Sequence, residues 1–152
     1  MHVRRLLTLA ALSLVSLSCG SRPAVTIDKE VTTLGTVEVT AQLTEIPGAF
    51  PPNDLYNYGY VMKYRVLAMH RGKVEGNEIF VAHYNPLKPR SRAQDEFSGR
   101  IGGHLERFHP GDTHRMALEA PLDQFWMGGV IDKYFSRKGV RYWAVWTNAE
   151  AK

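Results

Sequence analysis

The sequence predicts an all-β domain, mainly β with one short helix, in which five strands close into a small barrel. Apolar and polar residues alternate with a period of two in several segments, which is typical of strands with one buried face. Turns rich in glycine and proline separate these segments. Closure into a barrel hides the edges of so few strands, whereas a small β-sandwich, the alternative, is expected to have about seven.

The first predicted strand covers residues 33–44. Val37 and Leu43 belong to its apolar face, and polar residues alternate with that face. The stretch 46–54 that follows contains three prolines and a glycine, so we expect a loop there.

A hairpin is predicted from two further strands, 58–70 and 78–84, joined by a glycine-containing turn. Tyr60, Met62 and Tyr64 share one face of the longer strand. Its other face is only partly polar, so we expect this strand to be covered on both sides or coiled in a barrel.

The rest of the chain predicts a long polar excursion and two more strands. Residues 85–103 hold two prolines and several basic residues, and we expect them to form an exposed loop. A strand is expected at 113–120 and the last at 140–147. Between them, residues 122–127 predict one short helix that ends at two glycines.

The order of these elements resembles the OB-fold barrels of the netrin-like and metalloproteinase-inhibitor group. The similar stretches are Tyr64-Arg65-Val66-Leu67, Arg71-Gly72-Lys73, Ile79-Phe80-Val81 and Pro110-Gly111-Asp112. The disulfides of that group are absent, as are the N-terminal cysteines by which its inhibitors act, because the chain has one cysteine, at position 19. The resemblance therefore implies an OB-like barrel and no activity.

The N-terminus has the parts of an export signal. Arg4 and Arg5 precede an apolar stretch, 6–17, which is too short to span about 30 Å of hydrocarbon. With Ser18 and Cys19 after it, the segment resembles a bacterial lipoprotein signal, although Ser16 stands where a leucine is usual. The resemblance implies cleavage before Cys19 and attachment of lipid to its sulfur, and the alternative is an ordinary secreted protein.

The predicted organisation is a signal peptide over 1–18, a lipidated N-terminus and tether over 19–32, and a single β-rich domain over 33–152. Two or more acyl chains on Cys19 would hold the protein durably to the cell membrane or outer membrane, facing the periplasm or the cell surface. Removal of the signal lowers the formal net charge from +4 to +2. Such a nearly balanced surface argues against nucleic acid as a partner.

The histidines do not predict a metal site or a catalytic centre. His104, His109 and His114 are five residues apart, which fits neither the helical nor the strand spacing of metal ligands. No Gly-x-Ser-x-Gly elbow or phosphate-binding loop occurs. We expect no catalytic residue, metal or cofactor, and the alternative is an envelope hydrolase or transferase that acts on surface polysaccharide with His83, His104 or His109 as base.

Two surfaces are candidates for binding. If Tyr56 and Tyr58 lie beyond the buried part of their strand, they form an exposed platform for a sugar or a partner's apolar side chain; otherwise they cover the core. Arg90, Arg92 and Arg100 in the long excursion suit an anionic surface or are merely solvated. The sequence therefore predicts a membrane-anchored, non-enzymatic binding or accessory module for an envelope protein or glycan.

Overall fold

The computed structural model describes residues 28–151, and the predicted signal peptide, Cys19 and most of the predicted tether lie outside this range. The described chain consists of six strands and two single turns of 3-10 helix. The strands are β1 (Val37–Glu45), β2 (Tyr58–Arg71), β3 (Glu78–Tyr84), β4 (Thr113–Glu119), β5 (Gly129–Ile131) and β6 (Arg141–Ala149). The turns are η1 (Arg90–Arg92) and η2 (Leu122–Gln124).

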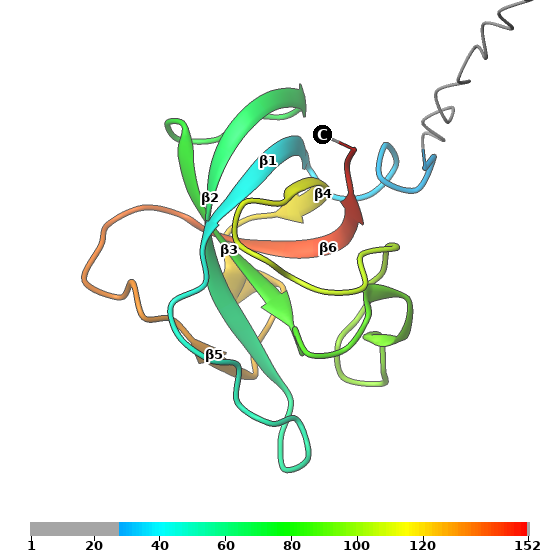
Figure 1. Cartoon of the computed structure of the whole chain (residues 1–152), viewed down its shortest axis with the longest axis vertical. Helices are drawn as coiled ribbons and strands as arrows, with labels where there is room; N and C mark the ends of the chain where they lie inside the picture. The colour runs from blue at the N-terminus through cyan, green and yellow to red at the C-terminus, as the bar shows by residue number, and fades with distance from the viewer. Residues whose placement is uncertain (1–27, 152) are drawn as a thin grey trace, which may run out of the picture.

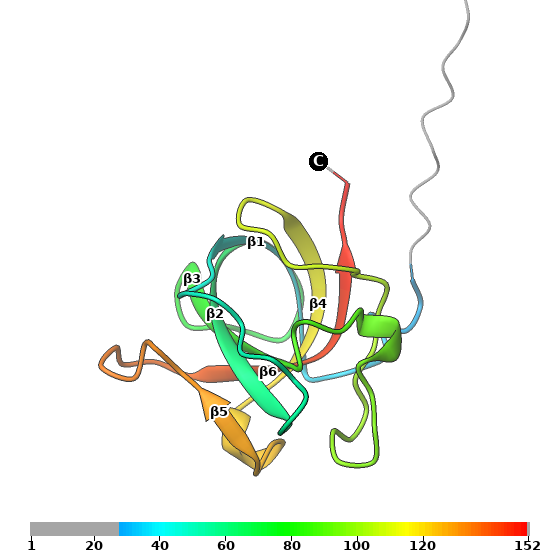
Figure 2. The same cartoon turned by 60° about the horizontal axis from the view of Figure 1, so that its bottom comes forward.

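Five of the strands close into a barrel, as Figures 1 and 2 show. The sheet order is β1-β4-β6-β3-β2, and β1 also pairs with β2, so the sheet has no free edge between them. Every pairing around the barrel is antiparallel except the parallel pair β3 and β6. The predicted all-β class and OB-like barrel are confirmed, and the alternative of a β-sandwich is wrong.

The barrel interior is filled from alternate positions of the strands. Tyr60, Met62 and Tyr64 of β2 are fully buried there, as their shared face predicts. Val39, Ala41 and Leu43 of β1 lie in the same core, with Met116 and Leu118 of β4. The period-two pattern thus reports the inward face of each strand.

A second apolar cluster covers the outside of β2, β3 and β6. The connection between β4 and β6 folds back over these strands, and its Trp126 stacks parallel to Trp143 with ring centroids 5.5 Å apart. Trp126 also packs edge-on against Tyr84 of β3. In OB folds the outer face of the second and third strands is a frequent ligand-binding surface. In this protein part of that face is occupied by the chain itself.

The connection also contains two local differences from the predicted elements. The predicted helix over 122–127 is wrong, because only Leu122–Gln124 form a 3-10 turn. The short strand β5 follows and pairs in parallel with the start of β2, which the two glycines there did not indicate. Trp126 causes this path, since its indole is buried against Trp143 and donates a hydrogen bond to the carbonyl oxygen of Gly129.

Residues 28–36 lie against the barrel, so the described part of the predicted tether belongs to the domain. Asp28 accepts hydrogen bonds from Trp146 and Asn148 of β6. Arg71, at the end of β2, donates to the carbonyl oxygens of Thr32 and Leu34. The expected start of the first strand at residue 33 is wrong because the chain turns there, at Gly35, before β1 begins.

Gly35 allows this turn to approach the barrel closely. Its φ is +68°, and a Cβ atom at this position would lie 2.5 Å from the carbonyl oxygen of Leu118. Any other residue would be strained there and would clash with β4. Among residues 28–151, no helix has the length and apolar character needed to cross a membrane.

Candidate functional site

The long excursion after β3 is more tightly packed than the sequence indicates. Arg90 is buried, and its guanidinium donates hydrogen bonds to the carbonyl oxygens of Tyr84, Asn85 and Lys88 at 2.7–2.8 Å. The expectation that Arg90 belongs to an exposed basic surface is therefore wrong. The carbonyl oxygens of a tight bend supply the acceptors that allow a charged side chain to be buried here. Arg92 and Arg100 are exposed, as expected.

The two tyrosines of the predicted platform have different environments. Tyr56 is 53% exposed, whereas Tyr58 is fully buried in the barrel core. The hydroxyl of Tyr58 donates to the carbonyl oxygen of Pro51 at 2.5 Å, and burial raises the pKa of Tyr58 to about 12. Of the two alternatives for Tyr58, the exposed platform is wrong, because the core extends to the first residue of β2.

Around Tyr56, several large apolar side chains are exposed at one end of the barrel. The parallel register pairs Tyr58 with Gly129 and Gly59 with Val130, so β5 lies beside the start of β2 at this end. Leu55 is 90% exposed and Met127 is 89% exposed. We call this set the distal patch, and it consists of Leu55, Tyr56, Met127 and Val130.

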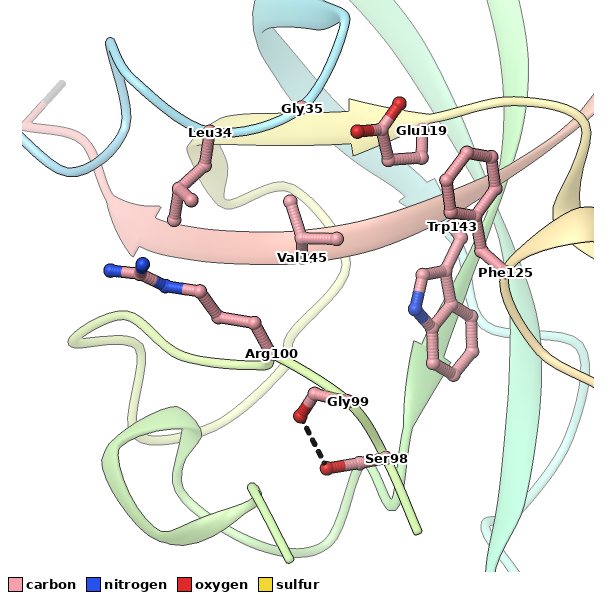
Figure 3. A pocket seen from close by; sticks show the side chains of 9 residues that line it. All are labelled: Leu34, Gly35, Ser98, Gly99, Arg100, Glu119, Phe125, Trp143 and Val145. Carbon is pink, nitrogen blue, oxygen red and sulfur yellow. Dashed lines mark hydrogen bonds between the residues drawn. The ribbon is translucent and has the colours of Figure 1, made fainter. Parts of the chain in front are cut away.

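A small groove lies on the outer surface of β6. It has a volume of about 260 Å³ and an apolar floor formed by Trp143 and Val145. Figure 3 shows Leu34 and Phe125 on its walls, and its charged residues are Arg100 and Glu119. Glu119 accepts hydrogen bonds from the backbone N–H and hydroxyl of Thr36, so its carboxylate is held by the turn ahead of β1.

A second pocket, of about 410 Å³, opens beside the loop between β1 and β2. Phe50 and Phe108 provide aromatic surfaces, while Arg107 and His109 add polar groups that are largely exposed. Phe108 separates this pocket from the barrel interior, since its ring centroid lies 4.5 Å from that of buried His83. We call it the Phe50–Phe108 pocket.

Inside the barrel, two histidines share one tyrosine. The hydroxyl of Tyr64 lies 3.0 Å from Nε2 of His83 and 3.1 Å from Nδ1 of His114, and all three side chains are fully buried. A hydroxyl has one proton, so Tyr64 donates to one ring and accepts from the other. Burial lowers the pKa of His114 to about 4, and burial together with the charge of Arg90 holds the pKa of His83 well below its usual value.

The other two candidate bases lie on the surface. His104 pairs with Asp28 at 3.2 Å, and His109 pairs with Asp112 at 3.4 Å. Burial raises the pKa of Asp28, but hydrogen bonds from Asn148 and Trp146 outweigh it and lower this pKa below its usual value. His83, His104 and His109 therefore occupy three separate places, and none of them shares an acid with another.

Among the described residues, no three His, Cys, Asp or Glu side chains converge to hold a metal ion. Sequence reasoning missed Leu55 and Met127. The one signal in the sequence is a large apolar residue beside a typical loop residue, Asp54 in one case and Gly128 in the other. Comparisons with protein-family models, characterised proteins and solved structures find no match to this chain.

Proposed function

We propose that this protein is a membrane-anchored envelope lipoprotein and acts as a non-enzymatic binding module for another envelope protein. The distal patch is the observation that carries the proposal. Leu55 and Met127 are almost fully exposed, although large apolar side chains of this kind are usually buried. Exposed large apolar side chains at one end of a domain are typical of a protein-binding site.

The residues that support the distal patch are firmly held. Tyr58, next to the patch, is buried and hydrogen-bonded to Pro51. Trp126, which precedes Met127, is stacked on Trp143. The patch thus has a fixed framework, which lowers the conformational entropy lost when a partner binds.

The position of the patch agrees with a lipid anchor on Cys19. The first described residues contact the end of β6 through Asp28, whereas the loop between β1 and β2 and the strand β5 lie at the opposite end of the molecule (Figures 1 and 2). With the N-terminus held at a membrane, the distal patch would face away from the bilayer, where a partner can reach it.

A glycan is the second candidate ligand, and the Phe50–Phe108 pocket favours it. Its aromatic rings can stack on a sugar, and Arg107 and His109 can bind hydroxyl or carboxylate groups. Apart from Tyr56, the side chains of the distal patch are not aromatic, so the patch favours a protein. An envelope enzyme is the weaker alternative, because His83 is sealed in the barrel while His104 and His109 are paired with different acids.

The anchor is tested by Cys19→Ala. We expect the wild-type protein in the membrane fraction and the variant in the soluble fraction, because Cys19 is the one cysteine available for acylation. The lipid anchor would be ruled out by a variant that stays in the membrane fraction through washes at high salt.

The binding surface is tested by cross-linking and affinity capture from the native envelope. The double variant Leu55→Ser/Met127→Ser should lose the captured partner, while Phe97→Ser, which changes an exposed phenylalanine in the excursion between β3 and β4, should keep it. If the double variant still captures the partner, the distal patch is not the site. Displacement by envelope polysaccharide, together with loss in Arg107→Gln, would instead support the glycan.

A further inference from the structure

Phe108 covers a buried group of polar side chains. Its ring centroid lies 4.5 Å from that of His83 and 5.7 Å from that of His114, and the guanidinium of Arg90 lies 5.3 Å from it. All three polar side chains are buried, and Phe108 itself is 7% exposed. Phe108 also lines the Phe50–Phe108 pocket. One aromatic ring therefore lies between a pocket that is open to solvent and this buried polar group.

Each of the three polar side chains has one nitrogen atom without a partner. Among the described residues, Nε of Arg90, Nδ1 of His83 and Nε2 of His114 make no hydrogen bond. The other nitrogens of Arg90 donate to backbone carbonyl oxygens, and the second nitrogen of each histidine contacts the hydroxyl of Tyr64. Buried polar atoms normally have hydrogen-bond partners, so three unsatisfied nitrogens in side chains that surround one ring are typical of a site that binds a polar group.

The three free nitrogens supply two hydrogen-bond donors. Nε of Arg90 always carries a proton. Tyr64 has one hydroxyl proton, so it donates to one neutral histidine and accepts from the other, which leaves one N–H and one lone pair on the two free ring nitrogens. Two N–H groups match the two oxygen atoms of a carboxylate.

The charge of Arg90 also favours an anion. Arg90 forms no ion pair with an acid of the described chain, and the three carbonyl oxygens that it contacts are neutral. Asp112, whose charge reaches His114, is partly exposed and pairs with His109. A buried charge is favoured when it is paired, and one carboxylate balances the single charge of Arg90. A doubly charged phosphate would instead leave excess negative charge in the core.

The segment that carries Phe108 can move without loss of backbone hydrogen bonds. Leu105 and Gly111 are anchored to the barrel by such bonds. Between these two anchors, residues 106–108 form no backbone hydrogen bond with another described residue. Phe108 is thus held by the packing of its side chain, and its ring can leave the barrel when that packing alone is lost.

We propose that Phe108 is a gate, and that the space it fills is a binding site for a small molecule with a carboxylate on an apolar or aromatic body. With Phe108 turned outward, the carboxylate binds the free N–H groups of Arg90 and of one histidine. The body takes the place of the Phe108 ring and extends toward Phe50 and Leu87 of the pocket. This site uses no residue of the distal patch, so it goes beyond the proposed function and does not depend on the lipid anchor.

Benzoate is the probe, and benzyl alcohol, of similar size and without charge, is its control. Both are titrated by calorimetry into the chain from residue 19 with Cys19→Ala. Phe108→Ala should tighten benzoate binding at least about tenfold relative to the ungated background, because no closed state has to open first. Benzyl alcohol should bind much more weakly than benzoate. Phe108→Val, which leaves a smaller cavity, serves the same purpose if Phe108→Ala does not fold.

Nuclear magnetic resonance of ¹⁵N-labelled histidine rings locates the bound probe. Benzoate should shift the signals of His83 and His114 in Phe108→Ala, and in the protein with Phe108 intact at higher benzoate concentrations, while His104 stays unchanged. Arg107→Gln/Phe108→Ala, which also removes an exposed cation of the outer pocket, should bind benzoate as Phe108→Ala does.

Three results would overturn the gate proposal. They are equal benzoate affinity with and without Phe108, equal affinity of Phe108→Ala for benzyl alcohol and benzoate, and absence of shifts at His83 and His114. Each of these results leaves the protein-binding proposal intact, because the variants of Leu55 and Met127 test it separately.

Discussion

The histidines of this protein occupy two contrasting regions. Inside the barrel, His83 and His114 are fully buried around Tyr64. On the surface, His104 and His109 are exposed, and each pairs with a different aspartate. The comparison shows that the histidines with lowered pKa values are the fully buried ones. In this fold a lowered histidine pKa is therefore a result of burial in the core.

The stability of the interior region depends on its two histidines remaining uncharged, because the charged side chain of Arg90 lies nearby. Arg90 is the buried cation of this region, and its guanidinium lies 5.3 Å from the ring centroid of Phe108, which also packs against both buried histidines. His83 Nδ1 and His114 Nε2 have no hydrogen-bond partner among the described residues. Protonation of either ring would therefore place a second charge near Arg90 with nothing to compensate it.

Removal of Arg90 should have the largest effect on stability. Arg90→Ala would leave the buried carbonyl oxygens of Tyr84 and Asn85 without their donor, and we expect it to lower the free energy of unfolding by about 4 kcal/mol. Urea denaturation monitored by tryptophan fluorescence measures this change.

The matched control is Arg92→Ala in the same 3-10 turn. Arg92 is exposed, so its removal should change stability by less than about 0.5 kcal/mol. Similar losses in the two variants would show that Arg90 is not a structural residue.

Acid should weaken the interior region. The unfolded chain binds protons on its histidines near pH 6.5, while buried His114 resists protonation down to a pKa of about 4. Stability should therefore be unaffected by His114 above pH 6.5 and fall as the pH drops from 6.5 to 4. His114 alone accounts for about 3 kcal/mol of this loss, and His83 adds to it in the same direction.

The pH dependence is measured by urea denaturation at successive pH values. In His83→Gln/His114→Gln the slope between pH 6.5 and 4 should become shallower, whereas His104→Gln/His109→Gln should retain it. If the slope instead becomes shallower in His104→Gln/His109→Gln, the buried histidines are not the source of the pH dependence.

Loss of the shared hydroxyl should have the smallest effect of the three. Tyr64→Phe keeps the ring and its packing but removes the hydrogen-bond partner of both histidines, at an expected cost of about 2 kcal/mol. Tyr56→Phe, in the exposed distal patch, should change stability negligibly. Equal stability of Tyr64→Phe and the wild type would mean that the hydroxyl makes no net contribution.

Most of the barrel could be predicted because its strands alternate apolar and polar residues. The faces of β1 and β2 follow from this period, as does the hairpin of β2 and β3. The path between β4 and β6 could not be predicted, since it depends on Trp126 packing against Trp143, seventeen positions further along the chain. Local sequence carries no sign of such a contact.

The candidate surfaces were predictable only in part. Tyr56, Arg92 and Arg100 are exposed as expected, but Tyr58 and Arg90 are buried. Alternation of apolar and polar residues along a strand does not show at which residue the core ends, so it does not tell whether a tyrosine near the end of the strand is buried. An arginine in a polar loop normally lies in solvent, and only the three carbonyl oxygens that the folded bend directs toward Arg90 change this outcome.

The contacts of Asp28 with β6 also have a mechanical consequence. A pull on the chain ahead of Asp28 reaches Trp146 and Asn148 before it reaches β1. β6 pairs with β4 on one side and with β3 on the other. Hydrogen bonds from Arg71 hold residues 32–34 at the end of β2. Tension is thus shared among strands that are far apart in sequence, so the first strand is shielded from being peeled off the barrel.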